Sequence, residues 1–185
     1  MFPTLPNCNF NLKLKDMKTA LIAMALLLSG TKFNAQKLNV DVENTRVEFV
    51  FTGDQTKGTV SGMQCEITFD LKNLKNSKIV GTIDASTLNT GNGGRDKHLH
   101  SADFFDVIKF PLMKFESTEF VSMEDDFKVV GNLTIKNIVE VCSIRFTYKE
   151  GVFKGETSID AKKYGVSPGK KDGNVDIVFT IPVIQ

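Results

Sequence analysis

Residues 175–183 read Val-Asp-Ile-Val-Phe-Thr-Ile-Pro-Val, with an apolar side chain at every second position from Val175 to Val183. Because successive side chains of a β-strand point to opposite faces, a period of two indicates a strand with one buried face. Pro182 has no amide proton to donate, which fits a position near the end or edge of a sheet. The stretch therefore predicts a long strand that covers an apolar interior.

The same alternation recurs in seven further segments of the chain. They are residues 46–51, 63–70, 79–83, 113–116, 127–135, 141–148 and 153–159. Turn-forming residues such as Gly53-Asp54 and Glu150-Gly151 separate these segments. The sequence thus predicts about eight strands, each with one apolar and one polar face.

An antiparallel sheet with one apolar face must either pack against a second layer or close on itself. Closure removes the exposed edges, and about eight strands make a barrel that can hold one small ligand. The predicted fold class is therefore all-β, an antiparallel up-and-down β-barrel of about eight strands. A two-sheet sandwich is the structural alternative.

The apolar faces define the predicted lining of the barrel. Its side chains are Phe49, Phe51, Ile67, Phe69, Ile79, Ile83, Met113, Phe115, Val129, Leu133, Ile144, Phe146, Phe153, Ile177 and Phe179. Such side chains form either a tightly filled core or an elongated apolar tube. A tube would accept a hydrocarbon chain, because each buried CH₂ group contributes about 0.8 kcal/mol.

One long connection, from Ala85 to Pro111, interrupts the alternation. The glycines at 91–94 oppose a strand, whereas residues 95–100 predict one or two helical turns. Long connections in small domains commonly form lids or binding loops. The apolar residues that would cover one mouth of the barrel, as a lid or as a plug, are Leu99, Phe104 and Phe105.

The N-terminal segment has a different character from the rest of the chain. Lys18, the apolar run from Ala20 to Leu28 and the small residue Ala35 together describe a secretory signal peptide. A bilayer span needs about 20 apolar residues, so this run is too short to cross a membrane. A buried core helix is the alternative interpretation.

We therefore expect residues 1–35 to be a signal peptide and residues 36–185 to be one exported domain, periplasmic or secreted and not membrane-spanning. Met17 is a more natural start, so residues 1–16 could be a mis-assigned extension.

Removing residues 1–35 changes the formal net charge from +1 to −2, because 19 basic and 21 acidic residues remain. The charged residues removed are Lys13, Lys15, Lys18, Lys32 and Asp16. A nucleic-acid partner would require a clustered basic surface, and the remaining lysines are scattered. We expect no nucleic acid as partner.

Two cysteines, Cys65 and Cys142, remain in the expected mature chain. In an exported protein they either pair as a disulfide or act as small buried hydrophobic residues. Neither has a second Cys or a His at ligand spacing, so we expect no metal site.

The candidate catalytic groups cluster around the only two histidines, His98 and His100. Residues that are two positions apart on a helix point in different directions, so His98 and His100 do not form a metal site there. Ser101 and Asp103 near His98 superficially suggest a catalytic triad, but no nucleophile elbow is present, and they are expected to cap a short helix. No cofactor-binding fingerprint occurs either, so we expect a protein without catalytic residues.

Several runs of this chain resemble the YceI-like, polyisoprenoid-binding family. They are Ser86-Thr87-Leu88-Asn89-Thr90-Gly91, Arg95-Asp96-Lys97-His98-Leu99, Ser101-Ala102-Asp103-Phe104-Phe105-Asp106, Phe110 to Thr118, Val130 to Ile135 and Tyr164-Gly165-Val166. The resemblance covers essentially the whole expected mature chain. It implies a lipocalin-like, extended antiparallel barrel that holds an amphiphilic isoprenoid in its lumen, in the bacterial periplasm or secreted.

By the same resemblance, the central motif lies beside the ligand entrance. The expected polar end of the site consists of Arg95, Asp96 and His98, next to the apolar lid residues Leu99, Phe104 and Phe105. The alternative is that these polar groups only fasten the long connection to the barrel rim by hydrogen bonds. The chain has Leu38 where the family commonly has Trp, which leaves the identity of the lipid open.

The leading hypothesis is a periplasmic or secreted binding and carrier protein for a long-chain isoprenoid, quinone-like or similar amphiphilic lipid. Shape and desolvation would provide the affinity. The alternative is a stress-response or interaction barrel with a filled core and no lipid. The oligomeric state is left open, with a homodimer as one option.

Overall fold

The computed structural model describes residues 37–166, 169 and 172–184, and the expected signal peptide lies outside these residues. The described strands are β1 (Lys37–Val40), β2 (Arg46–Phe51), β3 (Thr56–Val60), β4 (Gln64–Thr68), β5 (Lys78–Asp84), β6 (Leu112–Ser122), β7 (Phe127–Ile135), β8 (Ile138–Lys149), β9 (Val152–Asp160) and β10 (Asn174–Ile184). The helical elements are the short 3₁₀ helices η1 (Leu74–Asn76), η2 (Ala85–Thr87) and η3 (Ala161–Tyr164), and the α-helix α2 (Gly93–His100).

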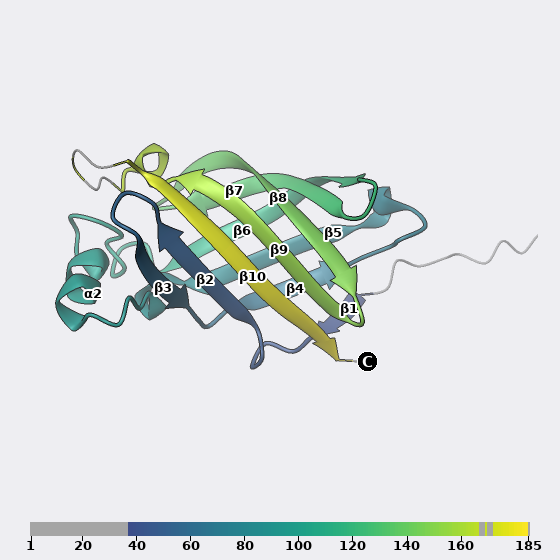
Figure 1. Cartoon of the computed structure of the whole chain (residues 1–185), viewed down its shortest axis with the longest axis horizontal. Helices are drawn as coiled ribbons and strands as arrows, with labels where there is room; N and C mark the ends of the chain where they lie inside the picture. The colour runs from purple at the N-terminus through teal and green to yellow at the C-terminus, as the bar shows by residue number, and fades with distance from the viewer. Residues whose placement is uncertain (1–36, 167–168, 170–171, 185) are drawn as a thin grey trace, which may run out of the picture. The chain divides into compact units, whose positions relative to one another are not determined.

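The strands form a closed antiparallel barrel (Figure 1). β2 pairs with β10 at residues 175–180, and β1 pairs with the same strand at residues 183–184. β1 also pairs with β4, while β2 pairs with β3. The segments β1 and β2 thus occupy one strand position, β3 and β4 occupy the next, and the ring has eight positions.

This ring confirms the predicted up-and-down barrel of about eight strands and excludes the sandwich. The prediction missed two short strands, β1 and β3. Each of the first two strand positions is divided into two segments by a short break in the strand, and only one segment of each was predicted. Residues 41–45 form the first break, where the Asp41 side chain accepts a hydrogen bond from the amide of Asn44 at 3.2 Å. The second break is at residues 61–63, where Gly62 has a left-handed φ of 69°.

Aromatic side chains of Phe69, the start of β7 and the β8–β9 hairpin pack into one core cluster. Figure 1 shows the β8–β9 hairpin at the end of the barrel opposite α2. Phe69, which directly follows β4, is at the centre of this filled end and is 8% exposed. Its ring makes edge-on contacts with Phe127 at 5.3 Å, Phe153 at 5.4 Å and Tyr148 at 5.5 Å between centroids. Edge-on geometry suits the charge distribution of aromatic rings, so this aromatic cluster closes the lumen at one end.

The long connection between β5 and β6 crosses the other end and carries α2 (Figure 1). Its base is closed by a hydrogen bond from the amide of Ala85 to the carbonyl of Pro111 at 2.8 Å. Asn89 pairs with Thr59 of β3 through two backbone hydrogen bonds of 2.8 and 3.0 Å. The connection is therefore fastened both to its own base and to the barrel rim.

Helix α2 confirms the predicted helical turns and extends them by two residues at the N-terminus. Its N-cap is Asn92, whose side-chain oxygen accepts from the amide of Arg95 at 3.0 Å. Ser101 is the C-cap and donates its hydroxyl to the carbonyl of His98 at 2.7 Å. The expectation that Ser101 and Asp103 cap a short helix is confirmed for Ser101, whereas Asp103 lies beyond the C-cap.

Candidate functional site

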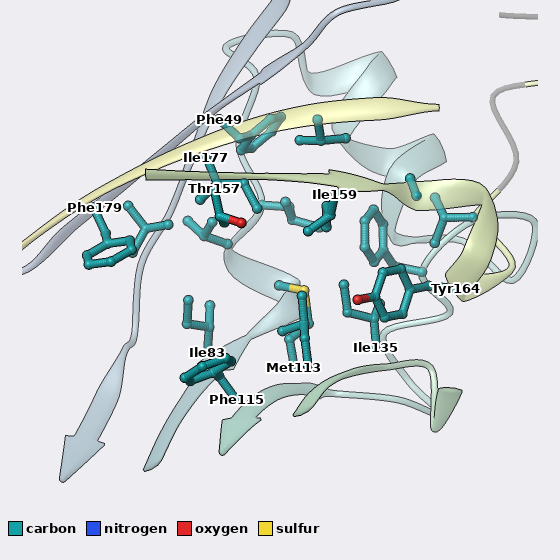
Figure 2. Close-up of a pocket in the computed structure, with 18 of the residues that line it drawn as sticks. Phe49, Ile83, Met113, Phe115, Ile135, Thr157, Ile159, Tyr164, Ile177 and Phe179 are labelled. Carbon is teal, nitrogen blue, oxygen red and sulfur yellow. The ribbon is translucent and has the colours of Figure 1, made fainter. Parts of the chain in front are cut away.

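The half of the barrel next to α2 contains a cavity of about 440 Å³. This volume lies within the range of roughly 300 to 1,000 Å³ that is typical of small-molecule sites. Strands β2, β3 and β5 to β10 supply most of its wall, and the long connection, η3 and a few residues of other turns supply the rest. Figure 2 shows the wall from inside, with apolar side chains converging from opposite sides of the barrel.

Eleven of the fifteen predicted lining residues lie on the cavity wall. They are Phe49, Phe51, Ile79, Ile83, Met113, Phe115, Val129, Leu133, Ile144, Ile177 and Phe179. The other four, Ile67, Phe69, Phe146 and Phe153, point into the same barrel but belong to its filled core and do not border the cavity. One half of the barrel is therefore a filled core and the other half is hollow, so each of the two alternatives describes only part of the barrel.

Large aromatic rings leave space in the lumen because they lie over glycines of neighbouring strands. A β-carbon on Gly58 would come within 2.3 Å of the ring of Phe49, its partner on β2. On Gly131 it would come within 2.5 Å of the ring of Phe115. Each ring thus occupies the volume that a side chain on the neighbouring strand would need, and it covers the wall instead of filling the centre.

The long connection covers the mouth of the cavity with apolar side chains, as predicted. Leu99, Phe104 and Phe105 all border the cavity. Leu88, which the sequence prediction missed, is 6% exposed and packs with Val47 in a second small core. The mouth is therefore covered by residues from both sides of α2.

Arg95 and His98, two of the three polar residues expected at the entrance, also border the cavity. The guanidinium of Arg95 donates a hydrogen bond to the hydroxyl of Thr56 on β3 at 2.9 Å. The ring of His98 contacts Phe104 edge-on, with 4.7 Å between centroids. Arg95 therefore both fastens the helix to the rim and faces the cavity.

Asp96, the third expected entrance residue, does not border the cavity. Its carboxylate accepts two hydrogen bonds from Thr90, one from the hydroxyl at 2.6 Å and one from the amide at 2.9 Å. These two bonds hold the pKa of the Asp96 carboxyl below its ordinary value. The structure thus gives Asp96 the fastening role that was the alternative interpretation.

The two histidines of α2 have different partners. The Nε2 atom of His98 lies 3.9 Å from the Asp103 carboxylate, whereas the Nε2 atom of His100 lies 3.0 Å from the carbonyl oxygen of Leu88. Within the described part of the chain, no group of three or more His, Cys, Asp or Glu residues is arranged to hold a metal ion.

A second polar group borders the cavity on β8, β9 and η3. The hydroxyl of Thr157 donates to the carbonyl of Ser143 at 2.8 Å and lies 3.4 Å from the sulfur of Cys142. Tyr164 is 2% exposed and also borders the cavity. Thr157 lies in the predicted strand at residues 153–159 but was not assigned to the site, and Tyr164 was named only as part of the family resemblance.

Cys65 and Cys142, the cysteines of the described residues, are both free, so the disulfide alternative was wrong. Cys142 is 5% exposed, as expected for a small buried hydrophobic residue, and borders the cavity. Cys65 packs against the filled core. Burial raises the pKa of both thiols, that of Cys65 to about 12.

The fold and the cavity together define a class of protein: an eight-position antiparallel barrel, filled at one end, with an apolar cavity under a helical cover at the other. The chain belongs to the YceI-like family, because the family model described as "YceI-like domain" matches residues 38–183. This match confirms the resemblance that the central motif carries.

Relatives from several bacteria match over much of the chain. A UPF0312 protein of Pseudomonas aeruginosa is 29% identical over 188 residues, which cover 92% of this chain and 98% of the relative. Protein YceI of Salmonella arizonae is 28% identical over 140 residues, which cover 69% of this chain and 73% of the relative.

Solved structures share the fold. BcnA of Burkholderia cenocepacia aligns with a TM-score of 0.73 at 22% identity, over 80% of this chain and 100% of that one. The YceI protein of Campylobacter jejuni aligns with a TM-score of 0.62 at 22% identity, over 70% of this chain and 85% of that one. A polyisoprenoid binding domain from Saccharophagus degradans aligns with a TM-score of 0.57 at 11% identity, over 78% of this chain and 95% of that one. In the described residues, no helix is both long and apolar enough to span a bilayer.

Proposed function

We propose that this protein binds one isoprenoid or similar amphiphilic lipid in the cavity and carries it as an exported, non-catalytic protein. The observation that carries the proposal is the cavity itself, a hollow of about 440 Å³ in the barrel whose wall is mostly Phe, Ile, Val, Leu and Met. An apolar wall binds a hydrocarbon by removing it from water, at about 0.8 kcal/mol for each CH₂ group.

Family membership supports the same ligand class. The Saccharophagus degradans domain that shares this fold is described as polyisoprenoid binding. The N-terminal signal-peptide pattern supports export, and an exported carrier would need to shield an apolar chain from water between membranes.

The size of the cavity limits how much lipid it encloses. A cavity of about 440 Å³ is of the size that encloses one small molecule. The aromatic cluster around Phe69 ends the lumen, so a longer chain would have to leave through the mouth next to α2. We therefore propose that the cavity encloses one short isoprenoid chain, or one end of a longer one.

Two neighbouring residues on β10 provide a matched test. Ile177 borders the cavity, whereas Val178 is 49% exposed on the outer face. Protein purified from a bacterial host is extracted with solvent, its lipids are identified by mass spectrometry, and uptake of added farnesol is measured by titration. We expect Ile177→Trp to fill the cavity and abolish retention and uptake, and Val178→Trp to retain both.

A wild-type protein without a co-purifying amphiphile and without uptake of farnesol would refute the lipid-binding proposal. Equal loss in both variants would refute the assignment of the cavity as the binding site. Thermal unfolding of each variant shows whether it is folded.

A further inference from the structure

The polar side chain that is most deeply buried at the cavity is Tyr164, the last residue of η3. The residue is 2% exposed, and Figure 2 shows its hydroxyl directed into the cavity. The turn around it is fixed by two backbone hydrogen bonds. The amide of Gly165 donates to the carbonyl of Lys162 at 3.0 Å, and the amide of Val166 donates to the carbonyl of Ala161 at 3.1 Å. The direction of the hydroxyl is therefore set by an ordered turn.

This turn also requires a glycine next to the tyrosine. Gly165 has a φ of 68°, in the left-handed region that glycine adopts without strain. Its carbonyl accepts a hydrogen bond from the Lys136 ammonium at 3.1 Å, which ties the turn to the β7–β8 hairpin. Tyr164 is thus held against the end of the barrel from two sides.

The hydroxyl of Tyr164 makes no hydrogen bond to another described residue, and it is not fully enclosed by protein, because it opens onto the cavity. The neighbouring polar group, Thr157, has its proton directed at the carbonyl of Ser143. Burial, together with the nearby Cys142 and Glu140, raises the pKa of Tyr164 to about 12. The phenol therefore keeps its proton at neutral pH and is a free donor that faces an apolar cavity.

We propose that Tyr164 donates a hydrogen bond to a neutral oxygen acceptor, such as a ketone or quinone carbonyl, on the lipid in the cavity. This inference rests on the proposed function. A neutral oxygen fits an uncharged donor among apolar side chains, where a carboxylate or phosphate would lose its hydration. The bond would pair the lipid with a hydroxyl that makes no hydrogen bond to another described residue.

The position of Tyr164 also orients the lipid. Figure 2 shows Tyr164 and Phe179 on opposite sides of the cavity. Phe115 and Phe179 pack against the filled core, at the closed end of the lumen. The oxygen-bearing group therefore lies at Tyr164, near η3, and the hydrocarbon extends towards the aromatic cluster.

The test uses two lipids and two variants. The lipids are farnesylacetone, an isoprenoid ketone, and its analogue in which a CH₂ group replaces the carbonyl oxygen. Tyr164→Phe removes the hydroxyl and keeps the ring. Tyr148→Phe is the matched control, since Tyr148 is the only other tyrosine of the chain and stacks on Phe153 in the filled end, at 4.2 Å between centroids.

We expect Tyr164→Phe to weaken binding of the ketone roughly three- to ten-fold and to leave binding of the analogue unchanged. Tyr148→Phe should change neither affinity. An independent measurement is the infrared stretch of the bound carbonyl, which a hydrogen bond shifts to lower frequency. The shift should be present in the wild type and in Tyr148→Phe and absent in Tyr164→Phe.

An equal effect of Tyr164→Phe on both lipids, or no effect on either, would overturn the inference while the proposed function stands. An unshifted carbonyl in the wild type would overturn it as well. Failure of both lipids to bind the wild type would overturn the proposed function and this inference together.

Discussion

The phenyl ring of Phe179 on β10 lies across Gly155, its cross-strand partner on β9. A β-carbon on Gly155 would lie 2.2 Å from the end of that ring and 2.9 Å from the carbonyl oxygen of Arg145. The ring can therefore lie against the wall only because the opposite residue has no side chain. The same arrangement at Gly58 and Gly131 shows that the hollow depends on glycines as much as on the residues that line it.

The first prediction concerns this glycine. Gly155→Ala should force Phe179 away from the wall, lower the free energy of unfolding by about 1–3 kcal/mol and reduce lipid uptake. Gly81→Ala is the control, because its β-carbon would meet its neighbours only at ordinary distances of 3.6 to 3.9 Å. Its free energy of unfolding should change by about 0.5 kcal/mol or less. Denaturant titration measures both, and equal destabilisation would contradict the prediction.

The second prediction concerns the filled end. Phe69→Ala should lower the free energy of unfolding by about 3–5 kcal/mol, because it removes the ring at the centre of the aromatic cluster. Phe104→Ala removes a half-buried ring at the mouth and should cost clearly less, while lipid exchange becomes faster. Urea unfolding and the rate of lipid release measure the two effects. A larger loss of stability at Phe104 would contradict the assignment of the filled end.

The third prediction concerns acidification of the mouth. The folded state lowers the pKa of Asp96, so the stabilisation from its carboxylate is present above the unfolded pKa and is lost as the pH falls through the folded value. We expect the amide of Thr90 to be protected from hydrogen exchange at pH 6 and to lose that protection only when the pH falls below the ordinary pKa of an aspartate.

In Asp96→Asn the backbone amide of Thr90 should be unprotected already at pH 6, because the neutral side chain of asparagine is a weaker acceptor than the carboxylate. Hydrogen exchange followed by mass spectrometry or NMR measures this difference. Protection of Thr90 that is independent of pH in the wild type would show that the carboxylate does not fasten this segment.

The fourth prediction concerns the thiols. Because burial raises the pKa of Cys65 to about 12 and also raises that of Cys142, both should react slowly with thiol reagents at pH 8 until the protein unfolds. Bound lipid should slow labelling of Cys142, which borders the cavity, and leave Cys65 unaffected. Peptide mapping distinguishes the two sites. A peptide that joins them under oxidising conditions would contradict the free-thiol assignment.

The alternation of side chains predicted the barrel because a strand with one buried face has the same period wherever it lies. The same property explains why the hollow could not be located. Phe49 and Phe153 have the same alternation in the sequence, but one borders the cavity and the other is 2% exposed in the filled core. Void volume depends on which rings meet across the barrel, and no local pattern encodes that.

The mouth shows a second limit of sequence reasoning. The family resemblance placed Arg95, Asp96 and His98 together at the entrance, but a helix turns successive residues in different directions, and Asp96 turns away to Thr90. Tyr164 was missed because it lies in a single turn without periodicity. Its role became visible only when the other residues around the cavity had been placed.

The closure of the ring has a consequence for how the chain folds. The seam joins Asn39 to Ile184 and Val40 to Val183, residues separated by almost the whole described chain. Contacts so distant in sequence carry a large entropy of loop closure and form late. Synthesis proceeds from β1 to β10, so the barrel cannot close until Ile184 has been added, and the unclosed intermediate exposes strand edges that must be kept from pairing with other chains.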